Sequence, residues 1–199
     1  MPPSPAASGP TVALGPDVSL TSEELERAAL DPDTQFRSTP AAEEALQAAR
    51  AALDRIREGD MPVYGVTTGF GPLHEYTADT EDPTAHGNAL ISHLATGAGD
   101  LAPPPLVRAM TGARLQSLAQ GHSAIRPPVF AAVIDLLEAN LTPAVPEIGS
   151  LGASGDLTPL AHVARACTGQ GRILDQNNQP IDASTALNRA NLSPVSLEA

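Results

Sequence analysis

The sequence of 199 residues contains no tryptophan, only two tyrosines and three phenylalanines, and a single cysteine, Cys167. Because aromatic residues are so scarce among its 42% hydrophobic residues, a core must be built from Ala, Leu, Val and Ile, which favours close-packed helices. One cysteine excludes an internal disulfide and a cysteine-rich zinc site. The five histidines show no metal-ligand spacing, so we expect no metal site, and a reducing cytoplasm is the expected location.

Lysine is also absent, so all 11 basic residues are arginines, and they stand against 23 Asp and Glu for a net charge of −12. Such an acidic surface repels polyphosphate and makes nucleic acid and anionic lipid poor partners. No run approaches the ~20 apolar residues that a membrane-spanning helix needs, and the N-terminal MPPSPAASGP lacks the basic start and apolar stretch of a secretion signal. We therefore expect neither nucleic acid nor a membrane as a partner.

Residues 1–19 are rich in Pro, Gly and Ser, and we predict that they form a flexible arm. Helical patterning begins after this segment. Thr21 and Glu24 have the spacing of a capping box at a helix start. Apolar spacing then predicts helices over 21–30, 39–58, 86–96, 103–121, 127–140 and 157–168. The three helices between residues 86 and 140 are expected to pack as a bundle. A small β-hairpin is predicted over 172–182.

Two glycine-rich loops interrupt the helices. The first, residues 61–84, contains most of the scarce aromatic residues and cannot be a regular helix. The second, residues 141–156, ends in the run GSLGASGD just before a helix that begins at Leu157. Asp156 is the predicted N-cap of that helix.

The run GSLGASGD surrounds Ser154 with small residues, which let the backbone turn sharply. If the amide nitrogen of Gly155 attacks the carbonyl carbon of Ala153, a five-membered ring closes across Ser154. Loss of water from the ring and from the hydroxyl then leaves an exocyclic methylene, a strong electrophile. Backbone N–H groups at the following helix N-terminus would favour negative charge on the ring oxygen.

These residues alone leave a plainer interpretation open and favour it, because a Ser or Asp that caps a helix after a glycine-rich turn is common. A serine hydrolase is disfavoured, since Gly152 and Gly155 flank Ala153 and Ser154 with the wrong spacing for a nucleophile elbow. Tyr64 in the first loop is, by itself, as readily a structural tyrosine as a catalytic one.

Four segments of the sequence must be considered together. In chain order they are Tyr64-Gly65-Val66-Thr67-Thr68-Gly69-Phe70-Gly71, His93-Leu94, Gln120-Gly121 and Ala153-Ser154-Gly155-Asp156-Leu157. With this combination, residues 20–199 resemble the aromatic amino acid ammonia-lyase and aminomutase family, which includes histidine, phenylalanine and tyrosine ammonia-lyases. The resemblance implies a mainly α fold over 20–199, the helical N-terminal domain of the fumarase/aspartase-like ammonia-lyase superfamily, with long active-site loops.

The resemblance also implies a cofactor made from the chain itself. Ala153, Ser154 and Gly155 would cyclise autocatalytically into 4-methylidene-imidazol-5-one (MIO), with no external cofactor. Asp156 and Leu157 would support the formation of this ring.

In the same family, the counterpart of Tyr64 is the catalytic base. As a phenolate it would remove a β-proton while the electrophile holds the substrate's amino group, and Phe70 and Gly71 would line the substrate site. Elimination would release ammonia and an α,β-unsaturated acid. A β C–H is a weak acid and ammonia a poor leaving group, so both ends need help at once.

His93 and Leu94 stand where substrate preference is set in the family. Histidine lyases tend to carry Ser-His there, phenylalanine lyases Phe-Leu, and tyrosine lyases and aminomutases His-Leu. The pair therefore favours tyrosine, with His93 bonding the phenolic hydroxyl and Leu94 lining the ring pocket. A histidine lyase and a tyrosine 2,3-aminomutase remain alternatives, and so does a helix histidine bonded to a backbone carbonyl.

The chain differs from the family in length. It lacks the Asn-Gly-Thr segment, the long central helices and an assignable arginine for the substrate carboxylate. We therefore expect a partial chain, one subunit of a split lyase, or an inactive fragment that serves as a helical interaction module. The family builds each active site from several subunits of a tetramer, so an oligomer or a complementing C-terminal subunit is expected to cover the apolar faces of residues 106–137.

Overall fold

The computed structural model describes residues 9–59, 61–71, 74–76 and 83–197. The described part is mainly helical, as predicted, with short strands between the helices. The helices are α1 (Ser22–Leu30), α2 (Pro40–Arg57), α3 (Pro83–Leu94), α4 (Pro104–Leu118), α5 (Pro127–Glu138), α6 (Leu157–Cys167) and α7 (Ala183–Arg189). The strands are β1 (Thr11–Leu14), β2 (Gln35–Ser38), β3 (Ala98–Leu101), β4 (Thr142–Pro143), β5 (Pro146–Ile148), β6 (Arg172–Leu174) and β7 (Pro180–Asp182).

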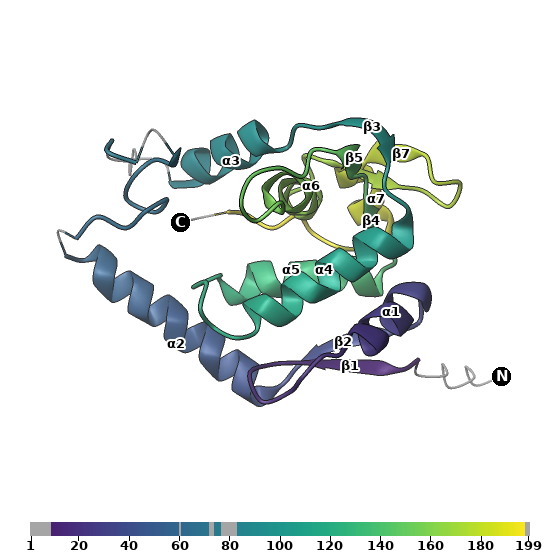
Figure 1. Cartoon of the computed structure of the whole chain (residues 1–199), viewed down its shortest axis with the longest axis horizontal. Coiled ribbons are helices and arrows are strands. Elements are labelled where there is room, and N and C mark those ends of the chain that lie inside the picture. The colour runs from purple at the N-terminus through teal and green to yellow at the C-terminus, as the bar shows by residue number, and fades with distance from the viewer. Residues whose placement is uncertain (1–8, 60, 72–73, 77–82, 198–199) are drawn as a thin grey trace.

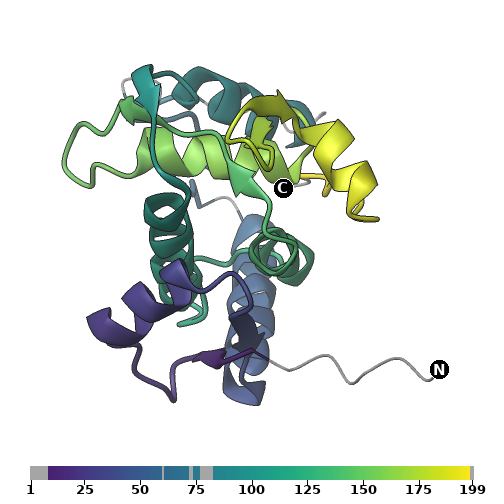
Figure 2. The same ribbon diagram turned by 90° about the vertical axis from the view of Figure 1, so that its right-hand side faces the viewer.

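The core lies around α4 and α5, which cross the middle of the molecule (Figure 1). α1, β1 and β2 lie on one side of this pair, and α3, α6 and the β6–β7 hairpin lie on the other, as both views show (Figures 1 and 2). Leu115 of α4, Leu136 of α5 and Phe36 of β2 are almost completely buried. The core is built mainly from aliphatic side chains, as the composition predicted.

Local capping signals set the starts of the first two helices. The Thr21 hydroxyl oxygen accepts a hydrogen bond from Glu24 N–H at 3.2 Å, and the Glu24 carboxylate accepts one from Thr21 N–H at 2.9 Å. This is the predicted capping box. At α2 the Thr39 hydroxyl oxygen accepts from Ala42 N–H, and Pro40 occupies the first turn, where it loses no hydrogen bond.

The prediction of a flexible arm over residues 1–19 is wrong for its second half. β1 pairs in parallel with β2, and Leu14 is fully buried. Gly15 N–H donates to the side-chain oxygen of Gln116 at 3.1 Å, which fixes the end of this strand to α4. Its stability comes from a partner strand distant in sequence, which composition does not reveal. Residues 1–8 lie outside the described residues.

The predicted three-helix bundle is also corrected. α4 and α5 pack together, but α3 packs against α6 on the far side of α6 from them (Figure 2). The reason is that β3, directly after α3, pairs with β5, directly before the loop that leads into α6. This pairing ties α3 to the α6 layer.

The predicted loop over residues 141–156 contains two short strands. β4 adds to the predicted hairpin, so that β4, β6 and β7 form an antiparallel sheet, while β5 pairs with β3. Proline in both strands hid them from the sequence analysis, because proline is tolerated only at strand edges and ends.

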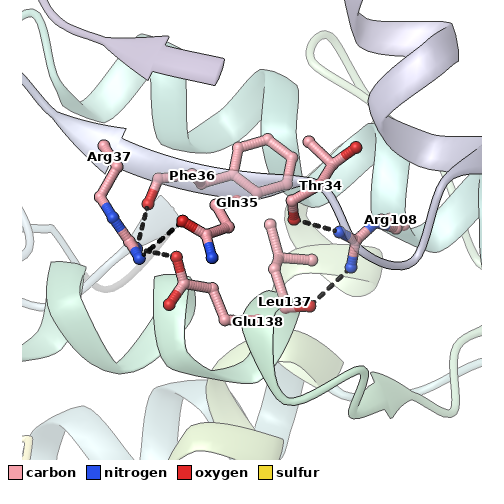
Figure 3. Close-up of polar contacts among 7 residues, drawn as sticks. All are labelled: Thr34, Gln35, Phe36, Arg37, Arg108, Leu137 and Glu138. Atoms are coloured by element: carbon pink, nitrogen blue, oxygen red, sulfur yellow. Dashed lines mark hydrogen bonds and ion pairs between the residues drawn. The ribbon is translucent and has the colours of Figure 1, made fainter. Parts of the chain in front are cut away.

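Arg108 is the main polar residue of the core, 8% exposed. It donates hydrogen bonds to the backbone carbonyls of Ala28, Thr34 and Leu137 at 2.8, 2.9 and 2.6 Å. Its guanidinium lies 5.5 Å from the ring centre of Phe36 (Figure 3). Burial lowers the pKa of Arg108, and nearby carboxylates partly oppose that shift. One cation thereby joins α1, the segment before β2, and α5.

Candidate active site

The Tyr64 segment, residues 61–71, is a series of tight turns after α2. Val63 N–H donates to the Thr67 hydroxyl at 2.8 Å, and Gly65 N–H donates to the Thr68 hydroxyl at 3.2 Å. Gly65 has φ +74°, and a Cβ there would lie 2.4 Å from Cε1 of Phe70. Glycine is therefore required at this position for both backbone and space.

Tyr64 projects from this segment and is 65% exposed. Its hydroxyl oxygen accepts a hydrogen bond from Gly71 N–H at 2.9 Å, and its ring meets Phe70 edge-on with 6.0 Å between the ring centres. Both contacts come from residues of the same segment, so the Tyr64 side chain is held locally. The structure therefore brings together three of the predicted site residues.

The 149–156 loop joins β5 to α6. Ala153 and Ser154 are exposed, and Gly155 has φ +70°, a conformation that other residues adopt only with strain. The Ser150 hydroxyl donates a hydrogen bond to the Gly155 carbonyl oxygen at 2.6 Å. The loop is thus closed from within, and the sequence analysis did not single out Ser150 for this role.

Asp156 occupies the predicted N-cap position of α6, but the prediction that its side chain caps the helix is wrong. Its side chain accepts no capping hydrogen bond, because the backbone there is already in the helical region rather than extended. The Asp156 carboxylate instead lies 3.9 Å from the Arg114 guanidinium of α4. Leu157, the first residue of α6, is 54% exposed.

The end of α3 and the 149–156 loop are attached to the same elements. Ala98 and Ile148 pair across β3 and β5, immediately before the loop begins. After the loop, His162 of α6 forms a hydrogen bond with the Thr96 carbonyl oxygen at 3.1 Å. A Cβ on Gly149 would lie 2.8 Å from a methyl carbon of Thr158, so the loop entrance is tight.

His93 and Leu94 are on the last turn of α3, with His93 exposed and Leu94 half-buried. None of the hydrogen bonds among the described residues involves His93. The alternative, in which His93 bonds to a backbone carbonyl, therefore has no support from these contacts. The imidazole is exposed at the end of α3 that is tied to the 149–156 loop.

The predicted site residues form two groups. Tyr64, Phe70 and Gly71 contact one another, and the 149–156 loop is closed by Ser150 and attached to α3. Among the described residues, no hydrogen bond, ion pair or ring contact joins the Tyr64 segment to the 149–156 loop. Sequence reasoning missed His86, whose ring stacks on Phe70, and no spacing signal indicated it.

Two grooves of the described surface lie away from these residues. One of about 910 Å³ opens between the α1 end, the α4 start and the β6–β7 hairpin, and one of about 660 Å³ lies beside β1 and α1. In the described part of the chain, no cluster of three or more His, Cys, Asp and Glu is placed to hold a metal. None of the described helices is long and apolar enough to cross a membrane.

Comparison with known proteins gives consistent results. The family profile described as aromatic amino acid lyase matches residues 20–199. The histidine ammonia-lyase of Myxococcus xanthus is 42% identical over 96% of this chain and 37% of its own length. The tyrosine ammonia-lyase of Cupriavidus metallidurans is 40% identical over 92% of this chain and 33% of its own length.

A solved structure agrees with these sequence matches. The tyrosine aminomutase of Streptomyces globisporus superimposes with a TM-score of 0.84 at 31% identity, over 94% of this chain and 35% of that chain. The present chain thus spans about a third of the length of the relatives that it matches. On the strength of the family profile over residues 20–199, the chain belongs to the aromatic amino acid lyase family.

Proposed function

We propose that this chain supplies the electrophile and the catalytic base of an aromatic amino acid ammonia-lyase that converts L-tyrosine to the α,β-unsaturated acid and ammonia. The observation that carries the proposal is the exposed turn over Ala153, Ser154 and Gly155, with Gly155 at φ +70° directly before α6. Family membership makes cyclisation of this tripeptide a better account than a simple capping turn, and Asp156 makes no capping bond.

The residues of the turn fit the proposed MIO ring. Gly155 has no Cβ to obstruct its amide nitrogen, and the Ser150 hydroxyl holds its carbonyl group. Ser154, which would lose its hydroxyl, is exposed. When present, the ring supplies an electrophile for the substrate's amino group, and the proposal includes no external cofactor. Asp156 and Leu157 keep the proposed supporting role at the start of α6.

Tyr64 is the proposed base. The Gly71 N–H that it accepts at 2.9 Å stabilises a phenolate oxygen, and the edge-on contact with Phe70 restricts the ring. The phenolate would take the substrate's β-proton as ammonia departs. Because the C–H acid is weak, catalysis depends on holding this oxygen in one place.

The preference for tyrosine rests on His93, whose exposed imidazole can bond a phenolic hydroxyl, and on Leu94 beside it. A site that hydrogen-bonds this hydroxyl rejects an analogue without it. The second candidate substrate is histidine, because the two relatives named for histidine and tyrosine have similar identity to this chain. A tyrosine 2,3-aminomutase would re-add ammonia at the β-carbon and give a β-amino acid.

The complete site is proposed to need further chain, from an oligomer or from a complementing C-terminal subunit. Support comes from the coverage of about a third of each relative and from the exposure of Tyr64 and Ser154. A cytoplasmic location belongs to the same proposal. Reading the downstream gene for an Asn-Gly-Thr opening distinguishes a split enzyme, where one is found, from an inactive fragment or interaction module.

The test is an ultraviolet difference spectrum of the assembled protein against its Ser154→Ala variant. We expect the parent alone to show the ring chromophore and to release ammonia from an aromatic amino acid. Ser184→Ala, at an exposed serine of α7, is the control for the loss of one hydroxyl outside the 149–156 loop. Coinciding spectra of the parent and Ser154→Ala would refute the proposal.

Substrate preference is tested by His93→Phe. We expect kcat/KM for tyrosine to fall by about tenfold to a hundredfold and kcat/KM for phenylalanine to rise. His122→Phe, at an exposed histidine in the turn after α4, is the control. An unchanged ratio, or a parent enzyme that prefers histidine, would reject the tyrosine assignment. Product analysis separates the acid of a lyase from the β-amino acid of an aminomutase.

A further inference from the structure

Three rings form a continuous contact between the Tyr64 segment and α3. The His86 imidazole, in the first turn of α3, stacks on Phe70 with 5.4 Å between ring centres and 9° between planes. Phe70 in turn meets the Tyr64 ring edge-on at 6.0 Å and 90°. Both arrangements are favoured geometries for aromatic pairs.

The contact that the structure shows for His86 is made by the face of its ring. The Nε2 atom of His86 is buried and has no hydrogen-bond partner among the described residues. A buried nitrogen without a partner is unfavourable, so stacking on Phe70 accounts for an imidazole here better than hydrogen bonding does. A Cβ on Gly65 would lie 2.4 Å from the Phe70 ring, so the Phe70 ring also packs closely against the backbone of its own segment.

The ring contact joins the Tyr64 segment to one particular face of α3. His86 and His93 are seven residues apart in the continuous helix α3, which places them two turns apart on one face. The Tyr64 segment is thus attached to the face of α3 that carries His93. The hydroxyl of Tyr64 is fixed separately, by Gly71 N–H.

We propose that His86 is a positioning residue for Tyr64. Through Phe70 it fixes the Tyr64 ring relative to α3, and with it the phenolic oxygen relative to His93. The catalytic part of this inference rests on the proposed function, in which Tyr64 is the base. The structural part, that the His86 ring restrains Tyr64, does not.

The structural part is tested with His86→Leu and His86→Phe. Both variants replace the imidazole with an apolar side chain and so remove the buried nitrogen. They differ mainly in whether a ring remains to stack on Phe70. The readout is the rate at which chymotrypsin cleaves after Tyr64 in the full chain, mapped by mass spectrometry. Phe36 and Phe130 are buried, so cleavage there reports general unfolding. His122→Leu is the matched control.

We expect His86→Leu to raise cleavage after Tyr64 by about twofold to tenfold, the range that the loss of one aromatic pair implies. His86→Phe and His122→Leu should cleave at the parent rate. Equal rates for His86→Leu and His86→Phe overturn the proposal. If His86→Leu also raises cleavage after Phe36, the variant has unfolded more generally. The cleavage rate is then measured in Phe70→Leu, which removes the stack by replacing its other ring.

The catalytic part is tested in the assembled enzyme. We expect His86→Leu to lower kcat about tenfold with little change in KM, because the base is misplaced while substrate binding is retained. His86→Phe should restore kcat. A change confined to KM, or no rescue by Phe, overturns the positioning role. A parent without lyase activity would reject the proposed function instead, and the proteolysis result would still decide the ring contact.

Discussion

The region around Arg108 and the surface that carries Tyr64 and Ser154 are organised in opposite ways. Arg108 is 8% exposed and donates to backbone carbonyls of three separate segments. Figure 3 shows two of these acceptors, Thr34 and Leu137. Tyr64 is 65% exposed, and its hydroxyl bonds to Gly71 of its own segment. Ser154 is exposed in a loop that the Ser150–Gly155 hydrogen bond closes.

The two regions differ in what their polar interactions connect. The Arg108 region links distant parts of the chain, which makes it a determinant of the fold. The Tyr64 segment and the 149–156 loop are closed locally by Gly71 and Ser150 and leave the Tyr64 and Ser154 side chains exposed. Functional groups on loops that a rigid scaffold positions are a common arrangement in enzymes.

The largest effect is expected at Cys167, which is buried at the end of α6. Burial raises its pKa from 9.0 to about 12, with the Asp135 charge adding to the shift. A thiol reagent at pH 8 should therefore react about a thousandfold more slowly with the native chain than with the urea-unfolded chain. Comparable rates would show that this end of the core is open.

The raised pKa of Cys167 also determines the direction in which pH changes the free energy of unfolding. Because the unfolded thiol loses its proton first, its contribution to the free energy of unfolding is fully present below pH 9.0 and declines as pH rises toward about 12. Urea titrations across this range should show the decline in the parent. Cys167→Ala should lack this component, and an identical pH profile in the variant would contradict the assignment.

The next effect is expected for Arg108→Met. The substitution keeps an apolar stem but leaves the carbonyls of Ala28, Thr34 and Leu137 without their donor, so we expect a loss of about 3 kcal/mol in the free energy of unfolding. Arg37→Met is the control, because the Arg37–Glu138 ion pair is largely exposed and should contribute at most about 1 kcal/mol. Urea denaturation measures both, and equal losses would remove the special role of Arg108.

A smaller and local effect is expected for Gly65→Ala. The new Cβ would strike Phe70, and φ +74° disfavours alanine, so we expect a local cost of about 1–2 kcal/mol that displaces the ring from Tyr64. Gly71→Ala is the control, since a Cβ there meets nothing within 4 Å and only the backbone cost remains. Chymotrypsin cleavage after Tyr64 should rise more in Gly65→Ala. The reverse order would contradict the observed packing.

The smallest effect is expected for Thr21→Ala, which removes the capping box of α1. The two reciprocal hydrogen bonds with Glu24 are exposed, so the loss should be about 0.5–1 kcal/mol. Ser22→Ala, one residue along and outside the box, should change stability less. Equal changes in the two urea titrations would mean that the box adds nothing measurable.

Features determined by neighbouring residues were predicted from the sequence. The Thr21–Glu24 capping box, the Thr39–Pro40 start of α2 and the hairpin around Asn178 all depend on short-range geometry. Features that depend on distant partners were missed. β1 exists because β2 supplies its hydrogen bonds, and α3 joins α6 because β3 pairs with β5.

The candidate site follows the same division. The contiguous residues of the Tyr64 segment and of the 149–156 loop were recognised as motifs, and Tyr64, Phe70 and Gly71 do lie together. The contact between Phe70 and His86 depends on how the segment after α2 folds onto α3, and no sequence spacing encodes it. Asp156 fits a cap by residue type, yet its backbone is helical rather than extended.

The proposed function depends on the conversion of Ala153, Ser154 and Gly155 into a ring. The intact mass of the assembled protein tests it most directly, with fragmentation to locate any change. We predict a mass lower than that of the sequence by two waters, localised to this tripeptide and absent from Ser154→Ala. An unmodified mass in the assembled parent protein would contradict the account.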